Sequence, residues 1–225
     1  MEGPEPLLIY KTLNKHFGFL HWWPGDTPFE VFVGAILTQQ TTWTNVEKAL
    51  TALKKSNSLS INKIAAMPIK KLQKLIRPSG YYRQKAARLR TICKIVLRDY
   101  GSLDNLFKLD KDELRKVLLS YSGIGRETAD SIILYAAEKP TFVIDAYTKR
   151  AMHRINHKFN EDIDYDMLQL YFEQRITRKL TLYKDFHGQF VELGKNYCKK
   201  SIPICSKCPL NRICQLGRER VKAKA

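Results

Sequence analysis

The chain has 225 residues, 44% of them hydrophobic, which is enough to fill the core of one large domain or two small ones. Thirty-nine Lys and Arg against 22 Asp and Glu leave a formal net charge of +17, which attracts polyanions and favours phosphate backbones, unless it is only a solvated basic surface or one that binds acidic lipids. We see neither a run of about 20 apolar residues nor a signal peptide, and therefore expect an intracellular (cytoplasmic or nucleoid) protein with no membrane partner.

The first 26 residues form an N-terminal arm. Residues 7–19 are amphipathic, and the aromatic run Trp22-Trp23-Pro24 follows them. After Thr27, Pro28 suits the first turn of a helix, and apolar residues then recur at three- and four-residue steps. Further helices are expected over residues 42–55 and 60–67, with a restart at Pro68 and a loop at residues 78–80.

One long helix is expected from Tyr81 to Tyr100, where Gly101 ends it, and two short helices from Ser102 to Tyr121. Cys93 falls on the apolar stripe of the long helix and is interpreted as a small buried side chain. Later helices are expected over residues 146–157, 167–180 and 182–197. Because no segment favours a sheet, the sequence predicts an all-α fold.

Two helical runs meet at the segment Ser122-Gly-Ile-Gly-Arg-Glu-Thr-Ala129. Gly123 and Gly125 permit backbone angles that other residues adopt only at a cost. Such a turn exposes amide N–H groups at a helix N-terminus, where they can bind a phosphate oxygen. The segment therefore predicts a helix-hairpin-helix.

Asp145 follows Glu127 by 18 residues. The helix from about Arg126 to Glu138 rises about 20 Å, Pro140 stops it, and residues 141–144 return as extended chain over about 13 Å. Asp145 can therefore lie close to the glycine turn. It is also a good N-cap for the helix that follows it, and the two roles are compatible.

Four of the five cysteines, Cys198, Cys205, Cys208 and Cys214, have the spacing C-x6-C-x2-C-x5-C. In a reducing compartment such a cluster is better interpreted as a ligand set than as disulfides. Four thiolates can hold either a tetrahedral zinc ion or an iron–sulfur cluster, and the residues alone leave both open. The same loop carries basic side chains that can present a rigid patch to phosphates: Lys199, Lys200, Lys207 and Arg212.

The hairpin segment, the aspartate 18 residues beyond it and the late cysteines together resemble the endonuclease III superfamily of DNA glycosylases, from about Thr27 to Cys214. The resemblance implies a six-helix bundle over residues 27–139, which carries the hairpin, and a second lobe built from residues 1–26 and 140–225. The hairpin and Asp145 would lie at the cleft between them. It also implies a [4Fe-4S] cluster at the four cysteines, with zinc as the alternative, a monomer, and duplex DNA containing a damaged base as the partner.

In that family the hairpin, here with Gly123, Gly125 and Arg126, grips DNA, and an aspartate corresponding to Asp145 drives removal of a base. Gln40 resembles the glutamine that these enzymes insert into the base stack, and Tyr81 stands at the usual wedge position. Without the resemblance, Gln40 is an ordinary helix-end amide and Tyr81 a surface aromatic residue.

Cleavage of an N-glycosidic bond builds positive charge on the sugar as the base departs. An ionised Asp145 can stabilise that charge and orient or deprotonate the attacking water. Family members that also nick the strand carry a nucleophilic lysine where this chain has Glu127, which cannot form a Schiff base, so we expect no AP lyase activity. Glu127 is equally well explained as a first-turn acid stabilised by the helix dipole.

The Trp22-Trp23-Pro24 run, residues 77–86 and the hairpin glutamate are similar to the 3-methyladenine glycosylase branch of the superfamily. An alkylated purine is cationic, and an indole face attracts cations. We therefore expect a base pocket with Trp22, Trp23 and Glu127, although the tryptophans could instead pack the arm. That branch can lack the iron–sulfur loop, which this chain carries in full.

Three other functions fit the sequence. The first is a monofunctional glycosylase for uracil or thymine opposite guanine, or for another damaged base. The second is a bifunctional enzyme for oxidised pyrimidines, which Glu127 disfavours. The third is a non-catalytic DNA-binding module, in which hairpin, cluster and charge supply affinity and Asp145 is only a cap.

Overall fold

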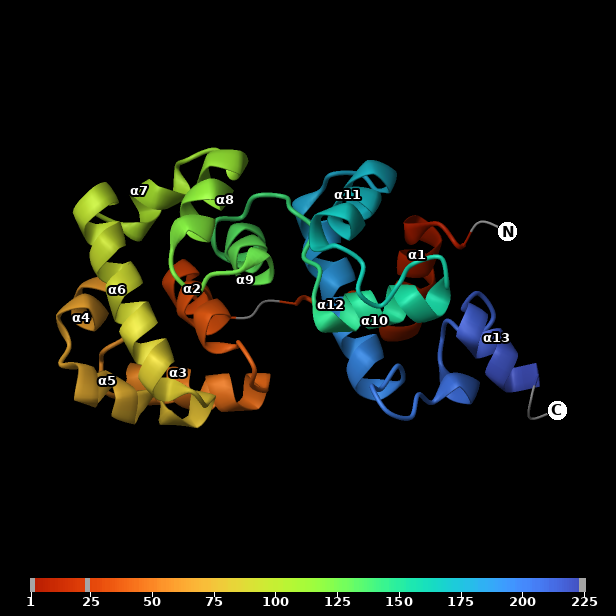
Figure 1. The fold of residues 1–225 in the computed structure, drawn as a ribbon, viewed down its shortest axis with the longest axis horizontal. Helices are drawn as coiled ribbons and strands as arrows, with labels where there is room; N and C mark the ends of the chain where they lie inside the picture. The colour runs from red at the N-terminus through yellow and green to blue at the C-terminus, as the bar shows by residue number, and fades with distance from the viewer. Residues whose placement is uncertain (1–2, 23–24, 223–225) are drawn as a thin grey trace. The chain divides into compact units, whose positions relative to one another are not determined.

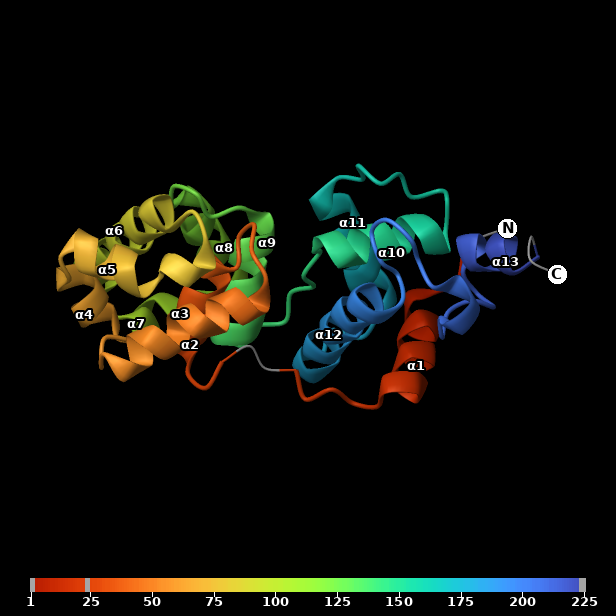
Figure 2. The same cartoon turned by 90° about the horizontal axis from the view of Figure 1, so that it is seen from below.

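The computed structural model describes residues 3–22 and 25–222, and every regular element in these ranges is a helix (Figures 1 and 2). This confirms the predicted all-α class. The chain separates into two compact units. Trp23–Lys139 forms the hairpin unit, and Met1–Trp22 together with Pro140–Ala225 forms the terminal unit. No helix in the described ranges is long and apolar enough to cross a membrane.

The hairpin unit is built from short helices around the long helix α6. Its elements are α2 (Pro28–Leu37), α3 (Trp43–Lys55), α4 (Ile61–Ala66), α5 (Ile69–Leu75), the 3-10 turn η1 (Arg77–Ser79), α6 (Tyr82–Tyr100), α7 (Leu103–Phe107), α8 (Lys111–Ser120), α9 (Arg126–Ser131) and η2 (Ile132–Ala136). Side-chain caps begin several of them, as at Thr27, whose hydroxyl accepts a hydrogen bond from the Glu30 N–H at 3.1 Å. Cys93 is fully buried on α6, and burial raises the pKa of its thiol to about 12, which confirms its packing role.

The helix expected from Arg126 to Glu138 is shorter and changes its winding. The α-helix α9 ends at Ser131, and the wider π-helical turn η2 continues to Ala136. There the Ala137 N–H donates to the Ile132 carbonyl, five residues back, at 2.9 Å. All five residues of η2 are buried, so the wider turn packs apolar side chains on every side, which the periodicity of an α-helix does not predict.

The terminal unit packs aromatic rings around α12. Its elements are α1 (Pro6–Phe17), α10 (Ala146–Ile155), α11 (Tyr165–Arg175), α12 (Leu180–Asn196), the 3-10 turn η3 (Cys205–Lys207) and α13 (Gln215–Lys222). The N-terminal arm up to Trp22 belongs to this unit, since Tyr10 packs on Phe186 with ring centroids 5.2 Å apart and the Leu20 N–H donates to Asp185 at 2.8 Å, whereas Asp26 pairs with Lys54 of the hairpin unit.

The boundary between the last two long helices was predicted wrongly. Helices were expected over residues 167–180 and 182–197, but α11 ends at Arg175 and α12 begins at Leu180. Ile176 adopts extended angles, φ −127° and ψ 147°, and is 7% exposed. Ile176 and Leu180 are four residues apart, so their spacing mimics a continuous apolar stripe across what is a connection between helices.

Candidate functional site

Asp145 is the N-cap residue of α10 and is almost fully buried, with 8% of its surface exposed. One carboxylate oxygen, Oδ1, accepts hydrogen bonds from the Thr148 N–H at 2.7 Å and the Thr148 hydroxyl at 2.8 Å. The other, Oδ2, faces His187 Nε2 of α12 at 3.5 Å. The predicted cap is therefore confirmed, and it engages only one of the two oxygens.

Asp145 is held ionised by its surroundings. Burial alone would raise the pKa of this carboxyl, but the His187 side chain and then the Thr148 N–H and hydroxyl outweigh it and hold the pKa below the usual range. His187 is itself buried, with 8% exposure. The pair forms a buried carboxylate with an imidazole beside it, an arrangement suited to stabilising positive charge that develops nearby.

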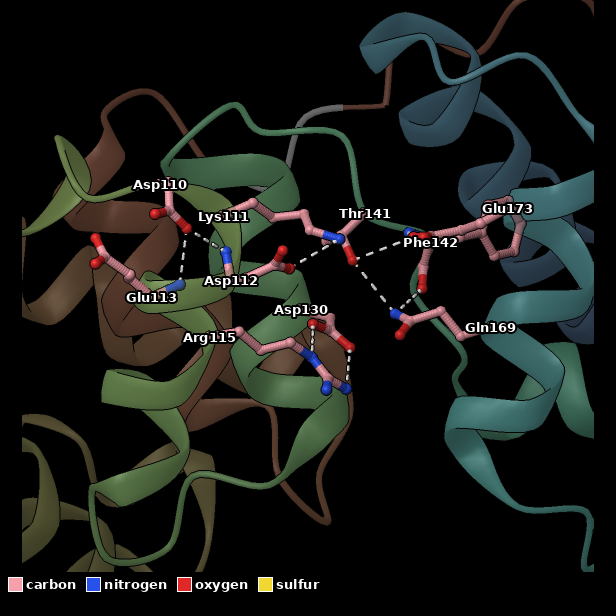
Figure 3. A network of polar contacts seen from close by, with 10 residues as sticks. All are labelled: Asp110, Lys111, Asp112, Glu113, Arg115, Asp130, Thr141, Phe142, Gln169 and Glu173. Atoms are coloured by element: carbon pink, nitrogen blue, oxygen red, sulfur yellow. Dashed lines mark hydrogen bonds and ion pairs between the residues drawn. The ribbon is translucent and has the colours of Figure 1, made fainter.

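The segment before Asp145 is extended, but it pairs with no strand in the part of the chain that the structure describes. Two side chains of α11 take the place of a neighbouring strand (Figure 3): Glu173 accepts from the Phe142 N–H at 2.8 Å, and Gln169 donates to the Phe142 carbonyl at 2.7 Å. Backbone polar groups in a buried segment require such partners. These contacts fix the course of the chain into Asp145.

The predicted hairpin joins α8 to α9 within the hairpin unit. Gly123 has φ +81°, a backbone conformation that favours glycine. A Cβ built at Gly123 would lie within van der Waals overlap of the Arg88 guanidinium. Ile124 is buried below the turn, and its N–H donates to the Tyr121 carbonyl at 3.0 Å. The expectation for Gly123 is thus confirmed in its backbone geometry.

Gly125 was expected to need the same freedom, and that expectation is wrong. Its angles, φ −93° and ψ 177°, are extended and open to any residue. A Cβ added at Gly125 would meet nothing within 4 Å. Gly125, Arg126 and Glu127 are all exposed, and none of the described residues would contact a Cβ at Gly125.

An N-cap and a salt bridge stabilise the helices on either side of the hairpin (Figure 3). Asp110 caps α8, accepting from the N–H groups of Asp112 and Glu113, each at 2.9 Å. Arg115 of α8 pairs with the fully buried Asp130 of α9 through two hydrogen bonds, at 2.8 and 3.1 Å. A bidentate pair of this kind fixes the angle between helices as well as their distance.

Gln40 and Tyr81 occupy the tips of two turns in the same unit. Both are exposed, Tyr81 to 62%. Both also have positive φ, +54° for Gln40 and +44° for Tyr81, a conformation that is costly for residues other than glycine. Their side chains are therefore presented outward on strained, sharply turned backbone.

Gln39 links the Gln40 turn to the hairpin. Its amide nitrogen donates to the Gly123 carbonyl at 2.9 Å and to the Thr128 hydroxyl at 3.1 Å, while its amide oxygen accepts from Arg88 of α6. The hairpin, α6 and the Gln40 turn thus meet at one side chain. Neither Gln39 nor Arg88 carries a motif signal in the sequence, so no role was predicted for either.

The three residues expected to line a base pocket are only partly described. Trp22 packs its ring against α12, where a Cβ on Gly188 would come 2.9 Å from it. Lys195 Nζ lies 5.1 Å from the centre of the Trp22 ring. Trp23 lies outside the described residues. Glu127 is exposed in the first turn of α9, as a helix N-terminus favours.

The four late cysteines line one small cavity, together with Arg154, Tyr197 and other residues of the loop. Arg154 donates to Cys198 Sγ at 3.3 Å and to the Lys199 and Lys200 carbonyls at 2.7 and 2.9 Å. Burial raises the pKa of the Cys208 thiol to about 12. In the described ranges, no three His, Cys, Asp or Glu side chains already stand close enough together to hold a metal ion.

The basic side chains expected on the cysteine loop are all exposed: Lys199, Lys200, Lys207 and Arg212. The backbone beneath the first two is pinned by Arg154, so that part of the patch is carried on an ordered chain.

A large open cavity in the hairpin unit carries no sequence motif. It measures about 680 Å³ and is lined by Trp43 and the acidic residues Asp26, Glu30 and Glu47. Lys54 closes one side, with its ammonium 2.6 Å from Glu30 and 2.8 Å from Asp26. The only sign of this cavity in the sequence is a group of acidic residues on a strongly basic chain, and it was not predicted.

Comparisons with known proteins agree with one another. The family model of the "HhH-GPD superfamily base excision DNA repair protein" matches residues 33–177. A provisionally named DNA repair glycosylase of Methanocaldococcus jannaschii is 44% identical over 208 residues, 92% of this chain and 94% of that protein. Endonuclease III of Thermotoga maritima is 30% identical over 205 residues, 88% of this chain and 87% of that protein.

Solved structures give the same result. The H. pylori 3-methyladenine DNA glycosylase bound to 1,N6-ethenoadenine matches with a TM-score of 0.76 at 33% identity, over 85% of this chain and 98% of that one. An endonuclease III–DNA complex matches with a TM-score of 0.82 over 96% of each chain; at 24% identity it shows likeness of fold. These matches confirm the resemblance on which the expected fold was based.

Proposed function

The chain belongs to the HhH-GPD superfamily of base excision DNA repair proteins, and we propose that it is a monofunctional DNA glycosylase that removes an alkylated purine from duplex DNA. The observation that carries the proposal is the buried carboxylate of Asp145, kept ionised by Thr148 and His187. A buried charge of this kind is costly to maintain, and catalytic sites are one of the places where proteins keep such charges.

Asp145 acts on the sugar once the nucleotide has left the stack. As the bond to the base breaks, positive charge grows on C1′ and O4′, and an ionised carboxylate facing them lowers the barrier. Oδ1 holds the side chain in place through Thr148, and Oδ2, which lies 3.5 Å from His187 Nε2, faces the sugar or orients the attacking water. Water then adds to C1′, its proton is lost, and an abasic site remains.

Strand cleavage is not part of the proposed reaction. The imine route needs an amine at the hairpin position occupied by Glu127, and a carboxylate cannot supply one. The product is therefore an intact strand with an abasic site, which alkali cleaves afterwards.

The hairpin supplies the grip on the backbone. Any residue could adopt the backbone angles of Gly125, and a Cβ there would meet no described residue. A glycine at this position therefore favours the close approach of a bound molecule, and an exposed helix N-terminus suits a phosphate. Arg126 beside it adds a positive charge. Gln40 and Tyr81 fill the gap left by the flipped nucleotide and separate the strands.

Two properties of this site favour an alkylated purine as the substrate, one at the sugar and one at the base. Its positive charge already weakens the glycosidic bond, so one carboxylate suffices without a nucleophilic lysine. The Trp22 ring already attracts one cation, the Lys195 ammonium at 5.1 Å. The 33% identical H. pylori 3-methyladenine DNA glycosylase supports the same choice. The same proposal assigns Trp22, Trp23 and Glu127 to recognition of the cationic base.

The residues around the late cysteines fit a [4Fe-4S] cluster. Four thiols line one cavity, Arg154 lies at its edge, and the Gly217 N–H lies 3.4 Å from Cys214 Sγ. Cations and N–H donors near sulfur stabilise thiolate ligands. When bound, the cluster supplies a rigid cross-link and no reaction step. Lys199, Lys200, Lys207 and Arg212 would then contact phosphates from a fixed loop.

The experiment incubates the protein with duplexes carrying 3-methyladenine, 7-methylguanine, uracil opposite guanine, or thymine glycol. Free bases are quantified by chromatography, and strands are examined with and without alkali. We expect release of the methylated purines and nicks only after alkali. Release of uracil alone would indicate a glycosylase for uracil opposite guanine, direct nicking would show a lyase, and binding without release would show a non-catalytic module.

A further inference from the structure

Two exposed turns of the hairpin unit share one buried anchor. Lys85 lies in the first turn of α6 and is 2% exposed. Its ammonium donates to the Leu37 carbonyl at 2.9 Å and to the Ser79 carbonyl at 2.6 Å. Leu37 stands three residues before Gln40, and Ser79 two residues before Tyr81. One ammonium therefore fixes the chain just ahead of both tips.

The chemistry of this anchor suits a lysine. Leu37 ends α2 and Ser79 ends η1, and carbonyls at helix C-termini lack partners within their own helix. An ammonium offers three donors and a positive charge that such ends attract. A helical side chain leans toward its own N-terminus, which brings Lys85 below the Tyr81 turn.

Lys85 is costly where it stands. It shares the buried face of α6 with Ala86, Leu89 and Ile92, and burial, followed by repulsion from Arg88, lowers the pKa of its ammonium to about 8. Leu, Ile or Met would fill this position more cheaply if packing were its only purpose. The lysine is therefore explained by the two carbonyls that it holds.

The tips need such an anchor. Gln40 and Tyr81 both have left-handed backbone angles, and non-glycine residues keep these only where the surrounding structure enforces them. If either turn relaxed, its side chain would swing away from the direction in which it now points. Lys85 opposes that relaxation in both turns at once.

We propose that Lys85 is a positioning residue that locks the Gln40 turn and the Tyr81 turn into one rigid device, so that both side chains enter the base stack together. This inference rests on the proposed function. Because Lys85 is buried, it acts through the two tips and touches no phosphate itself. Asp145 belongs to the other unit, so the chemical step does not depend on this lock once the nucleotide is extruded.

The test uses a duplex with a tetrahydrofuran abasic-site analogue, which requires no knowledge of the base removed. A 2-aminopurine opposite the analogue reports unstacking by its fluorescence. Three ligands are compared: this duplex, an undamaged duplex of the same sequence, and the analogue within an unpaired bubble. The variants are Lys85→Met, Lys85→Arg and, as matched control, Lys94→Met, which removes an exposed lysine of the same helix.

We expect Lys85→Met to lose about tenfold in affinity for the analogue duplex, together with the fluorescence rise, since flipping then lacks its paired wedge. Its affinity for the undamaged duplex should stay within about twofold, and in the bubble, where unstacking is already complete, it should match the wild type. Lys94→Met should behave as the wild type, and Lys85→Arg should retain part of the fluorescence rise.

The inference would be overturned if Lys85→Met kept the wild-type preference for the analogue duplex and the full rise in 2-aminopurine fluorescence. It would also be overturned if the variant lost the same affinity for the analogue in the duplex and in the bubble. If Lys85→Met does not fold, Gln40→Ala, Tyr81→Ala and the double variant test the inference instead. If the two turns act together, the double variant should lose no more affinity than the weaker-binding single variant. If they act independently, the fold losses of the two single variants should multiply. Failure of the wild type to prefer the analogue over undamaged DNA would instead contradict the proposed function.

Discussion

The two units present their functional groups in opposite ways. The terminal unit buries its carboxylate, Asp145, among Thr148 and His187. The hairpin unit exposes Gln40, Tyr81 and the glycine turn, which are held by the buried Lys85 and the half-buried Gln39–Arg88 pair.

This difference agrees with the role that we propose for each unit. Electrostatic stabilisation of a charged transition state is strong only where water is excluded, whereas a grip on a duplex must reach outward. Substitutions in the terminal unit should therefore change the rate of excision, and substitutions in the hairpin unit should change binding and flipping.

The largest expected effect is at Asp145. Asp145→Asn keeps the cap on α10 through its amide oxygen but removes the negative charge, so the single-turnover rate of base release should fall by about 10²- to 10⁴-fold. The dissociation constant for the abasic-analogue duplex should stay within about twofold. If Asp145→Asn also bound the abasic-analogue duplex much more weakly, the proposal that Asp145 affects the excision rate and not duplex binding would be contradicted.

The cysteine loop is the one part of the terminal unit that should affect binding. Cys208→Ala removes one of the four proposed ligands, so the purified protein should lose the visible absorbance expected of an iron–sulfur cluster, and duplex affinity should fall about tenfold as the basic loop loses its anchor. Cys93→Ala, at a buried cysteine of α6, serves as the control and should remain coloured. A colourless wild type with one equivalent of zinc would contradict the cluster.

Gly123 tests the grip of the hairpin unit. Gly123→Ala places a Cβ at φ +81° against Arg88, which should cost about 1–2 kcal/mol in unfolding free energy and weaken duplex binding about tenfold, with the excision rate from bound DNA unchanged. Gly101→Ala carries the same backbone penalty at φ +74°, with only Asn105 near the new Cβ, at 3.9 Å. It should destabilise without weakening binding, and an equal loss of affinity in both would contradict a specific hairpin contact.

The smallest expected effect concerns pH and sharpens the account of Asp145. His187 lowers the pKa of the Asp145 carboxyl, so His187→Phe should raise that pKa. The fall in excision rate at low pH should then begin at a higher pH. The rate should fall roughly threefold or more at pH 5 and change little at pH 8. His153→Phe, at a histidine that contacts the Phe159 carbonyl, is the control.

The same contact affects stability. Because the folded pKa of Asp145 is depressed, its contribution is present above the unfolded value of about 3.9 and is lost as pH falls through the lower folded value. Acid unfolding midpoints of wild type and His187→Phe measure that loss, and the variant should unfold at the higher pH. Coincident midpoints would show that His187 does not stabilise the carboxylate.

Several features could be predicted because a local rule determines them. The left-handed Gly123, the N-cap at Asp145 and the buried Cys93 each follow from neighbours within a few residues. The cysteine spacing likewise predicted four residues that line one cavity. The all-α class follows from helical periodicity along most of the chain.

The partners of these residues could not be predicted in the same way. His187 lies on α12, which is buried on nearly every side, so no amphipathic pattern distinguishes it. Lys85 did leave a signal, a charged residue on the apolar stripe of α6, but its two carbonyl partners lie 6 and 48 residues away. The π-helical turn of η2 and the break between α11 and α12 depend on packing that periodicity does not record.

The most direct measurement compares two duplexes that differ in one atom at the abasic position. One carries neutral tetrahydrofuran and the other a pyrrolidine, whose protonated nitrogen mimics the charged sugar of the transition state. The wild type should bind the pyrrolidine duplex at least about 100-fold more tightly, and Asp145→Asn should lose nearly all of that preference while still binding tetrahydrofuran. An equal preference in both proteins would show that the carboxylate of Asp145 does not face the reacting sugar.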